Sequence, residues 1–268
     1  MKLDRKIEYR DIDFAKFSSI KIGGKSKVAI IDKIEDIKNI EKCKIIGGGN
    51  NLLVSPLNSQ PLIILSKNFD YIFFEHSTLT VGGATPNGKL FHFVKKHNIG
   101  GFEFIQNLPS TLGGMLKMNA GVKTYEIFNN LISLKTENGE IDKSDIEFGY
   151  RYSKVNGIIL EAKFKISQTF SHDLVQQFYK MRSNQPKEHS AGSTFKNPLG
   201  LSAGKLIQDV GLKGYRIGDV AFSNIHANFL INLRNGKFDD AIKLIELAEK
   251  RVFDRFNIKL HREICIIE

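Results

Sequence analysis

Short apolar runs, bounded mainly by glycine, proline or charged residues, recur through the first two thirds of the chain and predict strands. A short helical pattern at 33–42 lies between the first two runs, which indicates a small α/β unit at the start. Thr85 and Pro86 are typical of a helix N-cap and first helical residue, so a helix is predicted from there to the Gly100–Gly101 pair. The predicted strands are 28–32, 44–46, 61–65, 78–83, 131–136 and 158–166.

The last hundred residues carry two clearer helical patterns. One covers 171–184, with Ser171 as the expected N-cap, and the other covers 238–256. A strand is predicted between them at 227–233. The second helix has an apolar stripe that predicts a core-facing side, formed by Ile242, Ile245, Leu247, Ala248, Val252 and Phe256. The mixture predicts an α+β fold in three lobes, which we place at 1–60, 61–168 and 169–268.

Composition adds the class of protein. The chain has 268 residues, of which 41% are hydrophobic and 25% charged, as is usual for a soluble globular protein. No apolar run approaches the roughly 20 residues of a membrane helix, and the charged start lacks the apolar stretch of a secretion signal. We therefore expect a cytoplasmic protein without membrane contact, in which Cys43 and Cys265 are reduced thiols.

The formal net charge of +10 favours anionic partners, either phosphorylated small molecules or nucleic acid. The basic residues are scattered along the chain, and no homeodomain, zinc-finger or RNP pattern is present. We therefore expect no nucleic-acid partner. We also expect no metal site and a monomer.

Two glycine loops are candidates for binding a phosphorylated cofactor. In "IIGGGNNLLV" three consecutive glycines follow a predicted strand, where they let backbone N–H groups approach an anion, and Asn50 and Asn51 add side-chain donors. The sequence matches neither a Walker A loop nor GxGxxG. A tight turn between strands is an equally good interpretation of this loop alone.

The second loop lies in "NLPSTLGGMLKMNAG", residues 107–121. Ser110 and Thr111 offer hydroxyl groups, and the residues after them look helical, so a helix N-terminus is expected to direct free N–H groups at the same ligand. Together the two loops would hold the two ends of an elongated dinucleotide.

Ser193 in "AGSTFKNP" is the main candidate for chemistry. No GxSxG elbow surrounds it and no SxxK follows it, so the serine could attack, bind phosphate or deliver a proton. A nucleophilic serine needs an adjacent base. The nearest histidine in the sequence, His189, belongs to no recognised triad pattern.

Several motifs occur in one order along most of the chain: "IIGGGNNLLV", "GFEFIQNLPSTLGGMLKMNAG", "FGYRYS", "AGSTFKNP", "AGKLIQDVGLKG", "SNIHANFLIN" and, near the end, "HREI". With them the chain resembles the UDP-N-acetylenolpyruvoylglucosamine reductases, flavoenzymes of bacterial cell-wall precursor synthesis. The resemblance implies that the first two lobes form an FAD-binding fold of the vanillyl-alcohol-oxidase type. It also implies a C-terminal α+β domain that closes over a UDP-sugar, with NADPH as hydride source.

The same resemblance implies three catalytic residues. Arg151 would grip the substrate carboxylate, which suits a planar guanidinium, although a surface salt bridge is the alternative. Ser193 would donate a proton, which requires a strongly basic carbanion as acceptor and groups such as Lys196 or backbone N–H groups that stabilise the alkoxide. Glu263 in "HREI" would be the acidic partner, as a neutral donor or by orienting a water.

Binding residues follow in the same way. Tyr150 would support the flavin or position Arg151, unless it simply packs, and it is grouped with three further substrate-binding candidates, Arg182, Lys196 and Asn197. Lys205 could meet phosphate, and His226 reads best as a packed or turn histidine. The residues implied for FAD are Gly47, Gly48, Gly49, Asn50, Asn51, Leu52, Pro109, Ser110, Thr111, Gly113, Gly114, Asn119, Ala120 and Gly121.

The chain also departs from the family pattern. "FSSIKIGG" at 17–24 stands where members commonly show Asn-Thr, and only 28 residues separate Ser153 from Arg182. The chain therefore looks like the shorter branch, which lacks an insertion carrying a substrate-covering tyrosine. Two other functions stay open on the sequence: a different flavin oxidoreductase of the same fold, and a basic nucleotide- or nucleic-acid-binding protein.

Overall fold

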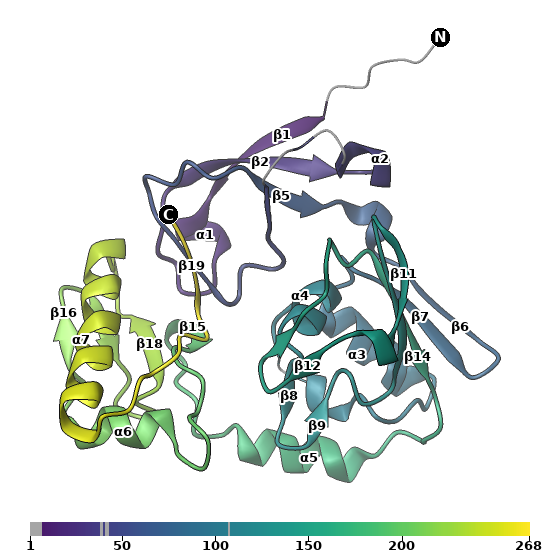
Figure 1. Ribbon diagram of the computed structural model, residues 1–268. Helices are drawn as coiled ribbons and strands as arrows, with labels where there is room; N and C mark the ends of the chain where they lie inside the picture. The colour runs from purple at the N-terminus through teal and green to yellow at the C-terminus, as the bar shows by residue number, and fades with distance from the viewer. Residues whose placement is uncertain (1–6, 38–39, 41–42, 107) are drawn as a thin grey trace. The chain divides into compact units, whose positions relative to one another are not determined.

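A computed structural model describes residues 7–268 except 38–39, 41–42 and 107. The chain forms two compact units, and the bounds of the first are Met1–Arg10, Val28–Gly48 and Pro61–Ser183. The second comprises Asp11–Lys27, Gly49–Gln60 and Asn184–Glu268. Both units mix helices and strands, as expected of an α+β protein (Figure 1). The division into three lobes stays a prediction.

A small sheet with the strand order β1-β2-β5-β3 has β3, β5 and most of β2 in the first unit. Strands β2 and β3 both run parallel to β5, and the short helix α2 lies between β2 and β3 in the chain, which matches the predicted strand–helix–strand start. The rest of the predicted helix at 33–42 includes 38–39 and 41–42, outside the described residues. The bounds are β1 (Glu8–Asp13), β2 (Lys25–Ile31), α2 (Ile34–Ile37), β3 (Lys44–Ile45) and β5 (Leu62–Leu65).

A second, antiparallel sheet in the first unit has the order β11-β10-β14-β7-β6. Alternate residues of its strands, such as Leu79, Val81 and Phe164, are buried against apolar residues of the helices. Figure 1 shows α3 and α4 beside this sheet. The elements are β6 (Ile72–Glu75), β7 (Thr78–Gly82), β10 (Leu131–Thr136), β11 (Gly139–Asp142), β14 (Glu161–Lys165), α3 (Asn87–Lys96), α4 (Leu112–Lys117) and α5 (His172–Met181).

Short elements complete the first unit and carry much of the candidate site. They are the paired strands β8 (Gly121–Val122) and β9 (Tyr125–Glu126), the hairpin strands β12 (Phe148–Gly149) and β13 (Tyr152–Ser153), and the 3₁₀ helices η1 (Lys67–Phe69), η2 (Glu103–Ile105) and η3 (Lys143–Asp145).

Two predicted helix ends in the first unit were wrong. Helix α3 starts one residue later than expected, with Pro86 at the N-cap, because the Thr85 hydroxyl donates to the Tyr71 carbonyl (3.1 Å) instead of capping the helix. The helix also ends before the glycine pair, because Asn98 takes a left-handed conformation (φ 56°). Ser171 caps α5 as predicted, by accepting a hydrogen bond from the Leu174 amide.

The second unit is built on a four-stranded antiparallel sheet with the order β15-β18-β17-β16. Helix α7 packs on this sheet, and the parallel pair β4 and β19 joins the chain end to the residues after the triple glycine (Figure 1). The bounds are α1 (Phe14–Phe17), β4 (Leu52–Val54), β15 (His189–Ser193), α6 (Ala203–Asp209), β16 (Arg216–Ile217), β17 (Val220–Phe222), β18 (Phe229–Asn232), α7 (Phe238–Phe256) and β19 (Cys265–Ile267).

Helix α7 has the predicted bounds, but its buried face is turned slightly from the predicted stripe. Ala241 and Leu244 are fully buried, whereas Ile242, Leu247 and Phe256 only pack partly against the core. The predicted stripe passed over both Ala241 and Leu244, which lie three residues apart on the buried face. Among the described residues, no helix is both long and apolar enough to cross a membrane.

Candidate functional site

Arg151 of the first unit occupies the turn of the β12–β13 hairpin, directly after Tyr150. Its backbone is left-handed (φ 62°), a conformation that costs a non-glycine residue energy and that gathers at functional sites. The guanidinium lies 5.1 Å from the centre of the Tyr150 ring, and one of its amino groups donates to the Gly121 carbonyl (3.0 Å). The turn therefore directs Arg151 back over the residues that end the second glycine loop.

The hairpin is fastened to the C-terminal end of α4. The Ser153 hydroxyl donates to the Leu116 carbonyl (2.9 Å), and the buried Asn119 amide donates to the Gly149 carbonyl (3.1 Å). Asn119 also donates to the Glu126 carboxylate (2.8 Å). Asn119 and Gly121, which the sequence assigned to the cofactor, thus hold the Arg151 hairpin in place.

Arg182 is the second guanidinium of this region, at the C-cap of α5. Burial lowers its pKa, and the positive charge of Arg151 lowers it further. Because a guanidinium keeps its proton in proteins, the first unit concentrates two positive charges that an anionic ligand would offset.

Gly47 of the first glycine loop lies close to the second loop within the first unit. A Cβ atom added at Gly47 would lie 2.7 Å from the Thr111 hydroxyl oxygen, closer than real Cβ contacts allow. The backbone of the first loop therefore approaches the hydroxyl of the second, and binding of a dinucleotide by the two loops stays a prediction. Gly114 lies similarly close to Ser110, since its added Cβ would be 3.0 Å from the Ser110 hydroxyl oxygen.

One expectation for this loop was wrong. The amides of Leu112 and Gly113 at the start of α4 donate to the carbonyls of Thr85 (3.0 Å) and Gly83 (2.9 Å), and are not available to a ligand. The bonding residues lie far away in sequence, so local pattern could not reveal them. With only six residues, α4 also has a weak dipole to offer.

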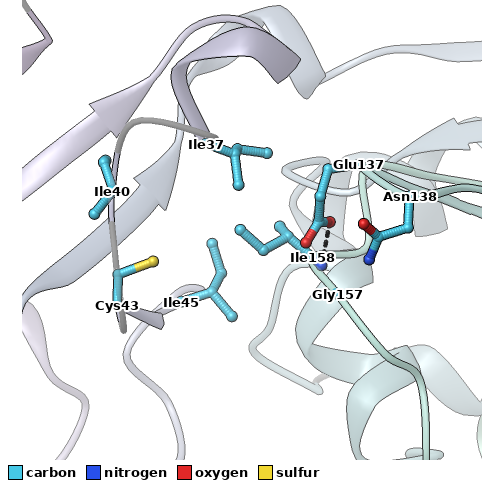
Figure 2. A pocket seen from close by; sticks show the side chains of 8 residues that line it. All are labelled: Ile37, Ile40, Cys43, Ile45, Glu137, Asn138, Gly157 and Ile158. Atoms are coloured by element: carbon cyan, nitrogen blue, oxygen red, sulfur yellow. Dashed lines mark hydrogen bonds between the residues drawn. The ribbon is translucent and has the colours of Figure 1, made fainter.

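A cavity of about 490 Å³ lies in the first unit, beside the strand that leads into the triple glycine. Figure 2 shows isoleucines from α2, β3 and the segment before β14 directed into it, with Glu137 at one side. The Glu137 carboxylate accepts a hydrogen bond from the Ile158 amide (2.6 Å). Burial raises the pKa of the Cys43 thiol, which favours its neutral form. The lining residues are Ile37, Ile40, Cys43, Ile45, Glu137, Asn138, Gly157 and Ile158.

Ser193 of the second unit ends β15 at a β-bulge. Ser190 pairs with Ile231 and Ser193 with Phe229, so one extra residue is inserted in β15 between the two pairs. Gly192 lies in that insertion with φ 78°, and a Cβ there would meet open space, so its backbone conformation and not crowding favours glycine. Bulges of this kind redirect a side chain next to active sites.

Glu263 lies next to Ser193 through the backbone. The Glu263 amide donates to the carbonyl of Thr194 (2.8 Å), and the Lys196 amide donates to the carbonyl of His261 (2.8 Å). The neighbouring Arg262 forms a two-point ion pair with Glu249 of α7, with N–O distances of 2.6 and 2.8 Å, which fixes the segment from the other side. Two predicted catalytic residues, distant in sequence, are therefore neighbours in the second unit.

The chain is similar over nearly its whole length to enzymes of one name. The C-terminal domain model of UDP-N-acetylenolpyruvoylglucosamine reductase matches residues 185–267. The reductase of Helicobacter hepaticus is 46% identical over 96% of this chain and 98% of its own length, and reductase 1 of Bacillus anthracis is 34% identical over 96% and 93%. The crystal structure of the reductase from Thermus caldophilus has a TM-score of 0.86 at 26% identity, and the match covers 98% of this chain and all of that one.

The chain belongs to the UDP-N-acetylenolpyruvoylglucosamine reductase family. The resemblance that the motifs indicated is thereby confirmed, and with it the expectation of an enzyme. The family assignment rests on the whole chain, because the relatives align with both compact units.

Other predicted residues of this reductase-family chain have structural partners. The Asn51 side chain donates to the Glu263 carbonyl (2.9 Å), and the Asn51 carbonyl accepts from Cys265, so Asn51 ties the loop to the chain end. The Asn197 side-chain oxygen accepts from the Ala203 amide (3.0 Å) at the start of α6. Lys205 pairs with Asp209 on the same helix.

The remaining predicted positions lie on the same two loops. The Gly49 carbonyl accepts from the amide of Ser19, and the Ser19 hydroxyl bridges the carbonyls of Asn50 (3.3 Å) and Ser190 (2.7 Å). Leu52 begins β4 and pairs with Cys265. Gly48 directly follows Gly47; Pro109 is exposed, and the Ala120 amide bonds back to α4.

Sequence reasoning missed two features of this region. It did not predict β15, and therefore not the bulge either, since a lone glycine signals a bulge only inside a strand pattern. It also passed over Asn228, which is 3% exposed and hydrogen-bonds Phe195 through both its side-chain oxygen and its side-chain nitrogen. No local signal distinguishes that asparagine from one in a turn.

Proposed function

We propose that the chain reduces UDP-N-acetylenolpyruvoylglucosamine to UDP-N-acetylmuramate with NADPH, through bound FAD. The observation that carries the proposal is the contact between the Ser193 and Glu263 segments, in which the Glu263 amide donates to the Thr194 carbonyl. The same proposal places the protein in the cytoplasm, as a monomer, in the synthesis of peptidoglycan precursors. Its partners are the UDP-sugar and NADPH.

The first unit fits FAD at the two glycine loops. The close approach of Gly47 to the Thr111 hydroxyl brings backbone of the first loop beside a hydroxyl of the second, and any side chain at Gly47 would collide with that hydroxyl. Gln106, which precedes the second loop, has a buried side-chain oxygen that lacks a partner among the described residues. The cavity beside Ile45, which isoleucines line together with Glu137 and Asn138, would take the adenine ring (Figure 2). When bound, FAD would pass hydride from NADPH to the enol ether of the substrate.

Arg151 would hold the substrate carboxylate. Negative charge grows on that carboxylate as hydride arrives, so a preorganised guanidinium stabilises the transition state more than the ground state. Arg182 would add a second positive charge toward the carboxylate or a phosphate. Tyr150 would keep the Arg151 guanidinium flat against its ring.

Ser193 would give its hydroxyl proton to the carbon next to the substrate carboxylate. A serine is a weak acid, so the acceptor has to be a strongly basic carbanion and the alkoxide has to be stabilised. The Lys196 ammonium, three residues further along, is the nearest cation in sequence for that purpose. Glu263 would be protonated beside the anionic substrate, or would orient a water that returns the proton. Asn197 would contact the substrate phosphates or the nicotinamide cofactor.

The test is a pair of anaerobic half-reactions. The purified protein should be yellow, NADPH should bleach it, and the enolpyruvyl UDP-sugar should restore the colour. Colourless protein that cannot be reconstituted with FAD contradicts the proposal. Bleached protein that regains colour with quinones but not with the UDP-sugar identifies a different flavin oxidoreductase instead.

A further inference from the structure

Asn228 lies immediately before β18 and holds the two residues that follow Ser193. The Phe195 amide donates to the Asn228 side-chain oxygen (3.0 Å), and the Asn228 side-chain nitrogen donates to the Phe195 carbonyl (2.8 Å). The Asn228 backbone carbonyl accepts from the Thr194 amide (2.7 Å). One buried residue therefore fixes the backbone of both Thr194 and Phe195.

The bulge explains why a side chain is needed at this point. The β15–β18 ladder ends with the pair Ser193 and Phe229, so Phe195 has no strand partner on the β18 side. A carboxamide has an NH₂ group that donates and an oxygen that accepts, with nearly the same spacing as the N–H and C=O groups of the backbone. The Asn228 side chain thus supplies the two hydrogen bonds that a paired residue of β18 would have made to Phe195. On the opposite side of this segment, the chain end hydrogen-bonds Thr194.

Thr194 passes this constraint to both proposed catalytic residues. It is joined covalently to Ser193, and its carbonyl accepts from the Glu263 amide (2.8 Å). Its hydroxyl oxygen accepts from the Leu230 amide (3.1 Å), which closes the ring of bonds around it. A shift of Thr194 would therefore move Ser193 and Glu263 together.

We propose that Asn228 is a positioning residue for proton delivery by Ser193, acting through the backbone of Thr194 and Phe195. The inference rests on the proposed function, since it assigns Asn228 to the step in which reduced enzyme is reoxidised by the UDP-sugar. Within the described residues, the hydrogen bonds of Asn228 join it to Thr194, Phe195 and His226 and not to the glycine loops. Asn228 variants should therefore leave reduction by NADPH unchanged.

Asn232 provides a matched control. It ends the same strand and is equally buried, with 3% exposure for each asparagine. Its side-chain nitrogen donates to the carbonyls of Ile20 (3.0 Å) and Lys21 (3.1 Å), and its side-chain oxygen accepts from Arg234 and Gly236. It makes the same kind of backbone clamp at a different place, so it reports what loss of a buried amide does to the fold.

The experiment compares Asn228→Asp with Asn232→Asp in the FAD-loaded protein, by anaerobic stopped flow. The aspartate has the shape of asparagine but loses the donor to the Phe195 carbonyl. We expect Asn228→Asp to slow reoxidation by the UDP-sugar by about 100-fold, the effect of a misplacement of about 1 Å. Reduction by NADPH should stay close to the wild-type rate in both variants. The solvent isotope effect on reoxidation should rise in Asn228→Asp alone, because proton transfer then limits the step.

Asn228→Ser, which stays neutral and cannot span both Phe195 groups, replaces the first variant if the carboxylate prevents folding. Equal rates of reoxidation in the Asn228 and Asn232 variants, with an unchanged isotope effect, would overturn the inference while the proposed function stands. Failure of the UDP-sugar to reoxidise the wild-type protein would overturn both. The reoxidation trace of the wild-type protein therefore tells failure of the proposed function apart from failure of the Asn228 inference.

Discussion

Arg151 in the first unit and Ser193 in the second both lie at irregular points of the backbone, a hairpin turn and a β-bulge. The two residues are held in place in different ways. Arg151 lies half-buried in a hairpin turn with a left-handed backbone, and its side chain contacts the Tyr150 ring and the Gly121 carbonyl. Ser193 follows a bulge inside a sheet, and the next two residues are clamped by a buried asparagine.

The difference follows from the reach of the two side chains. A guanidinium on a flexible stem can adjust to its ligand by rotation, so its backbone needs only to be roughly placed. A serine hydroxyl extends little beyond the backbone, so the backbone itself has to be accurate for proton transfer over hydrogen-bond distance. The second region should therefore be more sensitive than the first to changes that leave the reacting side chain intact.

The largest expected effect is that of Ser193→Ala. Loss of the proton donor should slow reoxidation by the UDP-sugar by about 10²–10⁴-fold, the usual contribution of general acid catalysis. Reduction by NADPH should remain near normal in stopped flow. Ser190→Ala, in the same strand, is the control and should change neither half-reaction; an unchanged reoxidation rate in Ser193→Ala would remove Ser193 from the mechanism.

Arg151→Lys tests the other region. The charge survives but the planar fork does not, so reoxidation should fall by about 10²–10³-fold, as for loss of one preorganised donor. The control is Arg216→Lys, because Arg216 is an exposed arginine paired with Asp219. A wild-type rate of reoxidation for Arg151→Lys would contradict a role for Arg151 in binding the substrate carboxylate and would favour the surface salt bridge instead.

Gly192→Ala sharpens the comparison by altering the backbone alone. Gly192 and Gly211 have similar φ values of 78° and 74°, and at both an added Cβ meets open space. Alanine at either should cost about 1–2 kcal/mol of stability, measured by chemical denaturation, since both require a left-handed backbone. Only Gly192→Ala should slow reoxidation, by about 10- to 100-fold if Ser193 shifts by up to ~1 Å. Equal kinetics in the two variants would show that the bulge does not direct Ser193.

The smallest effect concerns pH and His226, whose ring nitrogen Nδ1 accepts from the Asn228 amide (3.3 Å). Burial lowers the pKa of His226 from 6.5, opposed by its backbone hydrogen bond, and the charge of Lys213 lowers it further. The unfolded chain then binds a proton more readily than the folded one, so stability falls as pH drops below about 6.5. His226→Gln should make that fall shallower in denaturation curves at pH 7.5 and 5.5. An identical fall in both proteins would contradict this role for His226.

Local sequence signals predicted much of the fold but less of the site. The bounds of α7, the strand at 131–136 and the Ser171 cap follow from periodicity and capping chemistry, and the structure has all three. The motifs also named Ser193 and Glu263, which the structure places side by side. Because they depend on distant partners, the Thr85 hydroxyl bond to Tyr71 and the amide bonds that close the start of α4 were not predictable.

The Asn228 clamp belongs to the same class. Its partner Phe195 lies 33 residues earlier, and only the folded sheet shows that the ladder stops short of that residue. The bulge at Gly192 was missed as well, because no strand was predicted at 189–193. Sequence thus named the reacting groups, whereas the structure shows what holds them.

The central claim is that Asn228 acts on the reaction through proton delivery by Ser193, which the Glu263 segment joined to Thr194 supports. A double-mutant cycle tests it directly, with reoxidation by the UDP-sugar measured in wild type, Asn228→Asp, Ser193→Ala and the double variant. The account predicts that the double variant is no slower than Ser193→Ala alone. Once the Ser193 hydroxyl is removed, the hydrogen bonds of Asn228 no longer position a proton donor. Losses in rate that multiply fully in the double variant would contradict it.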